Sequence, residues 1–257
     1  MLYSTCMDKE KIKELAKSDK YISGIYNYCD RWCERCNFTN KCLSFEMSME
    51  SFDGGIDMND KKFWTELENS FKLVKDMLTE YMKEHNISLP TDEENAKIEL
   101  EMKKIDDTIK SNPLIVESKI YNRTTTNYLR ENDYFVPEPA AINEEDKEIE
   151  NLKRLQDAIE VILYYKNLIY VKLSRALHSF YTDDEDEYEG YEEDKLVSAR
   201  LAVVIIERSM AAWHFILEKN SNQSDMIIDL LLQLNKIKDG IEKLIPKVVD
   251  YKRPYFD

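Results

Sequence analysis

Apolar residues recur along most of this chain at the spacing of amphipathic helices. The helix expected from Asn59 carries six of them at alternating steps of three and four: Trp64, Leu67, Phe71, Val74, Leu78 and Tyr81. Such spacing places them on one helix face, so we expect a single buried stripe. Pro90 ends this helix, and Thr91 with Glu94 has the spacing of a capping box that opens the next one.

The same periodicity predicts further helices separated by prolines, polar runs and an acidic stretch. Their expected ranges are about 92–110, 113–131, 144–180, 195–219 and 224–245, after a short polar helix at about 8–18. The chain has only five glycines and six prolines, and no strand pattern is readable. We therefore predict an all-α fold: a helical bundle of about five to seven helices, built around those starting near 59, 144, 195 and 224.

The paired glycines Gly54 and Gly55 give the clearest linker signal, because adjacent glycines rarely lie inside a helix. The expected organisation is a module of residues 1–55, with a short helix and a cysteine-rich segment, followed by a helical bundle of residues 56–257. A chain of 257 residues is long enough to bury a sizeable core in the second part.

Four of the five cysteines lie within fourteen residues, spaced C-x3-C-x2-C-x5-C: Cys29, Cys33, Cys36 and Cys42. Thiolates this close together can hold one soft or borderline metal centre. Basic residues within the segment, Arg31, Arg35 and Lys41, would partly offset the negative charge of four thiolates. We therefore predict a metal site at these four cysteines and a free thiol at the distant Cys6.

Zinc and an iron–sulfur cluster both accept four thiolates, and both stay open. Structural zinc is the first hypothesis, although the segment lacks the two separated C-x2-C pairs of a zinc ribbon. Its C-x3-C-x2-C portion has the spacing of radical S-adenosylmethionine enzymes, but the strand-rich barrels of those enzymes are not indicated here, which excludes that class. Cysteines without a metal are the third interpretation.

Two segments resemble those of uncharacterised bacterial proteins that are all-helical and carry a short cysteine-rich N-terminus. They are Cys29-Asp-Arg-Trp-Cys33-Glu-Arg-Cys36 and the terminal Arg253-Pro-Tyr-Phe-Asp257. The resemblance would cover most of the chain. It implies an all-helical fold with a four-cysteine segment, and it implies no activity.

Four titratable residues occupy apolar stretches of the expected helices: Glu160, Lys166, Glu207 and His214. Buried charges must be paired or must shift their pKa values. If the helices 144–180 and 195–219 form an antiparallel hairpin, Lys166 and Glu207 lie at similar height, and we expect an ion pair between them. A di-iron site is disfavoured, because neither glutamate begins the Glu-x-x-His spacing that such sites use.

The net charge of −15 is concentrated in the run 183–194, which holds nine acidic residues and no basic one; the remaining 42 acidic and 36 basic residues leave −6. We expect this run to be a solvated loop. An acidic chain has no general attraction for phosphates, which disfavours nucleic-acid binding. No run of about 18 uncharged apolar residues indicates a membrane span. The first residues lack the pattern of a secretion signal, so we expect reduced thiols and a cytoplasmic protein.

No nucleophile motif, phosphate-binding loop, dinucleotide fingerprint or metalloprotease motif is present, so the sequence gives no positive reason to propose an enzyme. The resulting hypothesis is a metal-binding helical protein with structural zinc that acts as an interaction or adaptor protein and has a protein partner. The alternative is an iron–sulfur protein with a redox or sensing role. The oligomeric state is left open.

Overall fold

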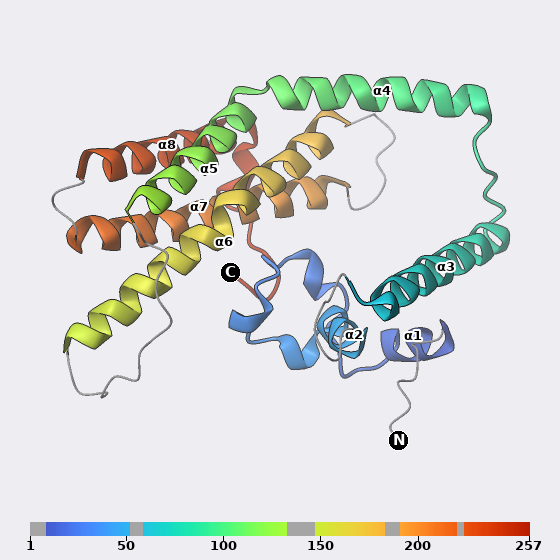
Figure 1. Cartoon of the computed structure of the whole chain (residues 1–257). Helices are drawn as coiled ribbons and strands as arrows, with labels where there is room; N and C mark the ends of the chain where they lie inside the picture. The colour runs from blue at the N-terminus through green and yellow to red at the C-terminus, as the bar shows by residue number, and fades with distance from the viewer. Residues whose placement is uncertain (1–8, 52–58, 133–146, 183–190, 220–223) are drawn as a thin grey trace. The chain divides into compact units, whose positions relative to one another are not determined.

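The computed structural model describes residues 9–51, 59–132, 147–182, 191–219 and 224–257 (Figure 1). Within these ranges the chain forms eight α-helices, joined by loops and short 3-10 helices, and no strand. The all-helical class is therefore confirmed for the described residues. None of their helices combines the length and the hydropathy needed to span a membrane.

The chain divides into two compact units, Met1–Ile98 and Glu99–Asp257. The first unit is made of short elements followed by one long helix: α1 (Lys9–Ala16), η1 (Ile25–Asn27), η2 (Cys33–Arg35), η3 (Thr39–Lys41), α2 (Leu43–Ser51) and α3 (Lys61–Glu84). The boundary expected between residues 55 and 56 falls outside the described residues, as does the greater part of the acidic run.

Helix α4 (Asp92–Ser111) begins at the predicted capping box. The Thr91 hydroxyl accepts a hydrogen bond from the Glu94 backbone N–H at 3.3 Å, and the Glu94 carboxylate accepts one from the Thr91 backbone N–H at 2.8 Å. Two backbone donors that the helix itself cannot satisfy are thus paired reciprocally. This start signal, read from the sequence alone, is confirmed.

The stripe on α3 is helical as predicted, but its burial was wrongly predicted. No described side chain of α3 is buried, and Phe71 and Val74 are 68% and 62% exposed. The physical reason is that periodicity shows which face of a helix is apolar, and does not show that another part of the same chain covers that face.

The second unit contains a four-helix bundle of α5 (Pro113–Glu131), α6 (Lys147–Tyr181), α7 (Tyr191–Lys219) and α8 (Ser224–Leu244). Helix α5 packs against α6 and α8, and α7 packs against the same two helices, so α5 and α7 face each other across the interior (Figure 1). The largest fully buried side chains come mainly from these helices and include Ile115, Tyr121, Leu129, Ile162, Tyr165, Ile169, Leu173, Leu201, Ile205 and Trp213.

All four bundle helices were predicted as helices, but α5 was not among the helices expected to build the bundle. It takes the place expected for the helix that starts near residue 59. The buried face of α5 includes the polar residues Ser118 and Thr125, which weaken the hydrophobic pattern. Ser118 is tolerated there because its hydroxyl donates to the Ile115 carbonyl at 2.8 Å.

Candidate functional site

Short 3-10 turns place the four cysteines of residues 29–42, called here the cysteine segment. Cys33 is the first residue of η2 and Cys36 follows its end, while Cys42 follows η3. The backbone N–H of Cys36 donates to the Cys33 carbonyl at 3.1 Å, and that of Cys42 donates to the Thr39 carbonyl at 3.3 Å. Three of the four thiols therefore lie at the ends of tight turns, where a side chain can be presented without a long helix.

The segment is closed into a loop by the backbone N–H of Ile22, which donates to the Lys41 carbonyl at 3.0 Å. This hydrogen bond joins the start of the loop to its end. Ile25 and Trp32 are buried inside, with exposed fractions of 2% and 6%, and are the only buried hydrophobic side chains among the described residues of the first unit. Two side chains make a very small core, so apolar burial alone stabilises this unit weakly.

The part of the loop between Cys29 and Cys36 is shaped by local polar contacts. The Asp30 carboxylate accepts from the Trp32 backbone N–H at 3.1 Å, and the Arg35 guanidinium lies over the Trp32 ring at 4.0 Å from its centroid. Arg31 has φ 65°, a left-handed conformation that costs a residue with a side chain about 1 kcal/mol or more. The chain thus turns sharply between the first two cysteines.

All four thiols are reduced and half-buried. Burial raises the pKa of Cys33, and the nearby charges of Cys29, Cys36 and Cys42 raise it further. Burial also raises the pKa of Cys29, opposed by a hydrogen bond from the Arg31 backbone. The Cys33 thiol therefore feels the charge of all three other cysteines.

One backbone donor is directed at a sulfur of this group, since the Phe38 N–H lies 3.3 Å from Cys36 Sγ. Donors of this kind support thiolate ligands. Within the described ranges, however, no group of three or more His, Cys, Asp or Glu side chains is arranged to hold a metal ion. The donor chemistry fits zinc or an iron–sulfur cluster, while the thiols as placed do not form a closed ligand shell. The metal site stays a prediction.

The expected ion pair between Lys166 and Glu207 does not form. Lys166 Nζ donates to Asn122 Oδ1 at 3.2 Å and to Thr126 Oγ1 at 3.0 Å, both on α5. Glu207 instead pairs with Lys238 Nζ on α8 at 2.7 Å. The hairpin of α6 and α7 was predicted correctly, but height along a helix does not fix rotation about its axis, and the two side chains lie on different sides of the bundle.

The other two candidates were also wrongly predicted to be buried. Glu160 is exposed, and the side chain of His214 is 67% exposed and pairs with Glu218 on its own helix at 3.3 Å. Each lies beside apolar neighbours that point into the bundle, while its own side chain points outward. The four candidates therefore do not form one site.

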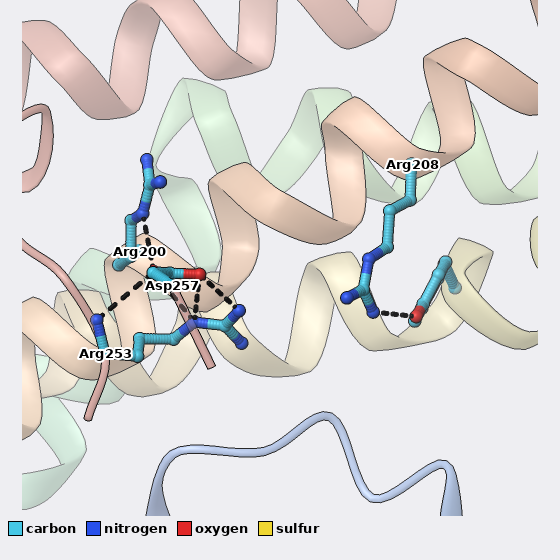
Figure 2. A network of polar contacts seen from close by, with 5 residues as sticks. Arg200, Arg208, Arg253 and Asp257 are labelled. Atoms are coloured by element: carbon cyan, nitrogen blue, oxygen red, sulfur yellow. Dashed lines mark hydrogen bonds and ion pairs between the residues drawn. The ribbon is translucent and has the colours of Figure 1, made fainter. Parts of the chain in front are cut away.

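A polar network that the sequence analysis did not assign joins the last residues to α7 (Figure 2). The side chain of Arg253 is 2% exposed, and its Nη2 donates to Asp257 Oδ1 at 2.7 Å, while Arg200 Nε donates to Asp257 Oδ2 at 3.1 Å. Burial of Asp257 would raise the pKa of its carboxyl, but the hydrogen bonds from Arg253 and Arg200 outweigh it and hold that pKa well below its usual range. The sequence feature that could have indicated this network is the terminal Arg253-Pro-Tyr-Phe-Asp257 motif.

Comparison of the chain with protein-family models, with curated proteins and with solved structures gives no match. The resemblance based on Cys29 to Cys36 and on the terminal motif therefore stays a prediction.

Proposed function

We propose that Cys29, Cys33, Cys36 and Cys42 together bind one soft or borderline metal ion, with zinc as the first candidate. The observation that carries this proposal is the placement of four half-buried thiols on one short loop, in a unit whose described residues include two buried hydrophobic side chains. A segment that cannot build its own core gains most from a metal, because the binding free energy of the metal becomes folding free energy. Zinc would supply a redox-inert centre that cross-links the loop.

The electrostatics of the loop support this proposal. Burial raises the pKa values of Cys29 and Cys33, so these thiols are protonated at neutral pH without a metal. A bound cation would displace those protons and balance the negative charge that the four thiolates impose on one another. The Phe38 N–H directed at Cys36 Sγ would donate to the resulting thiolate.

The role that follows is that of an interaction or adaptor protein. In the second unit, charged side chains such as Glu207 and Arg253 pair with other residues of the same unit. In the first unit, which contains the cysteine segment, α3 exposes large apolar side chains. Exposed apolar surface of this kind is typical of protein-binding faces. The metal would hold the cysteine segment of this unit in one conformation.

An iron–sulfur cluster is the second candidate, and one observation favours it. The thiols are half-buried, and a backbone N–H points at Cys36 Sγ; hydrogen bonds to sulfur and partial exposure both tune the reduction potential of a cluster. With this group bound, the same four cysteines would serve redox or sensing chemistry.

The test is to purify the protein without oxygen and to measure metal, acid-labile sulfide and visible absorption. Cys33→Ser is the informative variant, because Cys33 feels the charge of all three other cysteines, and Cys6→Ser is its matched control. We expect one zinc per chain and no colour for the protein and the control, with zinc lost in Cys33→Ser. Iron with sulfide and a brown colour would select the second candidate, and protein without metal would refute both.

A further inference from the structure

The exposed stripe of α3 has the spacing of a coiled-coil seam. Its steps of three and four average 3.5 residues over three heptads, with Trp64, Phe71 and Leu78 at one core position of the repeat and Leu67, Val74 and Tyr81 at the other. This strict repeat is narrower than the apolar face of an ordinary surface helix. Apart from Leu67, these side chains are 50% to 68% exposed.

The face of α3 that contacts α1 is a different one. Leu73, Met77 and Glu80 are half-buried, and Glu80 pairs with Lys9 and, at 3.4 Å, with Lys13 of α1. These positions lie about 90° to 150° around the helix from the centre of the stripe. On the heptad side Leu67 is half-buried, as are Phe63 and Met82 at its edges, while the other five side chains of the stripe stay exposed.

We propose that the stripe binds the same stripe of a second copy of this chain, with the two α3 helices antiparallel. The proposal is independent of the metal. Around a two-fold axis at the middle of the stripe, Trp64 of one copy would face Tyr81 of the other, and Phe71 would face Val74. The two-fold axis makes each of these facing pairs occur twice, so the two stripes cover each other along three heptads. A helix of 24 residues is about 36 Å long, enough for this seam.

Charge complementarity selects the second copy and the antiparallel direction. Glu68 and Lys75 flank the stripe on one side and are exposed, and neither forms an ion pair with another described residue. In one helix they are seven residues, about 10 Å, apart, too far to pair. In the antiparallel arrangement Glu68 of each copy lies beside Lys75 of the other, giving two ion pairs. A parallel arrangement would place Glu68 beside Phe63 and Lys75 beside Ser70, which gives none.

The first experiment measures the mass of the full chain in solution by light scattering and sedimentation over a range of concentrations. We expect a dimer that dissociates on dilution. Val74→Glu, in the middle of the stripe, should give a monomer with unchanged helix content, because Val74 makes no buried contact in the single chain. Thr79→Glu adds the same charge five residues further along α3, at an exposed position outside the stripe, and should stay dimeric. A monomer at every concentration, or a dimeric Val74→Glu variant, would overturn the proposal.

The second experiment tests the direction of the helices by exchanging charges. Glu68→Lys and Lys75→Glu should each weaken the dimer about tenfold, because two attractive pairs become repulsive. An equimolar mixture of the two variants should restore the affinity, since each chain then carries the charge that the other needs; the double variant should restore it as well. Full affinity in both single variants would rule out the antiparallel register.

Discussion

Trp213 Nε1 donates a hydrogen bond to Tyr121 Oη at 2.9 Å, across the interior of the bundle. Both side chains are fully buried, and they come from α7 and α5, the two helices that face each other without being neighbours. The edge of the Tyr128 ring packs against the indole with ring centroids 5.4 Å apart. A directional hydrogen bond in an apolar core restricts how these helices shift along their axes and rotate about them. Apolar contacts alone restrict these movements less.

Tyr121→Phe should therefore destabilise the protein by about 1–3 kcal/mol. The substitution keeps the ring, but it leaves the buried indole N–H of Trp213 without an acceptor, and the cost of an unpaired buried donor falls in that range. The free energy of unfolding in urea measures it. Tyr170→Phe is the matched control, because that half-buried ring packs under Lys119, and its loss of a hydroxyl should change the stability by less than about 0.5 kcal/mol. Equal effects of the two variants would contradict the assigned role of the bond.

The buried phenol of Tyr121 should also make the protein less stable at alkaline pH. Burial raises the pKa of Tyr121 to about 12, while a tyrosine in the unfolded chain titrates near 10. Above pH 10 the unfolded chain loses this proton and the folded protein keeps it, so this phenol lowers the stability by up to about 1.4 kcal/mol per pH unit until pH 12. Other tyrosines and lysines titrate in the same range, so the measurement is the difference in slope between the protein and Tyr121→Phe. Parallel slopes would show that Tyr121 titrates normally.

Asp257 predicts a loss of stability at the acid end of the range. The hydrogen bonds from Arg253 and Arg200 hold its pKa below that of an unfolded aspartate, so its contribution is present above about pH 4 and is lost as the pH falls further. Asp257→Asn should cost about 3 kcal/mol at neutral pH, because it leaves the buried Arg253 without its counterion. The cost should shrink toward pH 2. Asp250→Asn, at an exposed aspartate nearby, should change the stability little at any pH.

The sequence was sufficient to predict the helices, and insufficient to predict which of them pack together. Start and stop signals such as Thr91, Glu94 and Pro113 act locally, so the ends of α4 and α5 could be derived from neighbouring residues. Packing depends on contacts between residues far apart in the chain. Helix α3 has the stronger apolar stripe and stays exposed, whereas α5, with Thr125 in its buried face, enters the bundle.

The same difference between local signals and long-range contacts applies to the candidate site. The four cysteines could be singled out because their spacing is local, and the turns η2 and η3 place Cys33, Cys36 and Cys42 at their ends. The partners of Lys166 and Glu207 could not be predicted, since each depends on how a helix is rotated against two neighbours at once. The Tyr121 to Trp213 bond spans 92 residues and has no local signal.

A double-mutant cycle on Lys166 and Glu207 should show no coupling. Lys166→Met keeps the apolar stem and removes the bonds to Asn122 and Thr126, at a cost of about 1–2 kcal/mol. Glu207→Gln removes an exposed pair with Lys238 and should cost less than about 1 kcal/mol. Because the two residues have different partners on different helices, the double variant should equal the sum within about 0.5 kcal/mol. A larger coupling energy would show that Lys166 and Glu207 interact directly, and would contradict the structure.

Removal of the proposed metal should affect only the first unit. All five cysteines lie at or before Cys42, so no thiol ligand comes from the bundle of residues 113–244. A chelator should therefore speed tryptic cleavage at Arg31, Arg35 and Lys41, where the loop depends on the metal, and leave the thermal unfolding of the bundle unchanged. Mass spectrometry of the fragments locates the cuts, and calorimetry follows the bundle. Cys33→Ser should be cleaved at the same sites without chelator. If the chelator left the cleavage rate of the loop unchanged in protein that contains metal, the ion would not be holding the loop together.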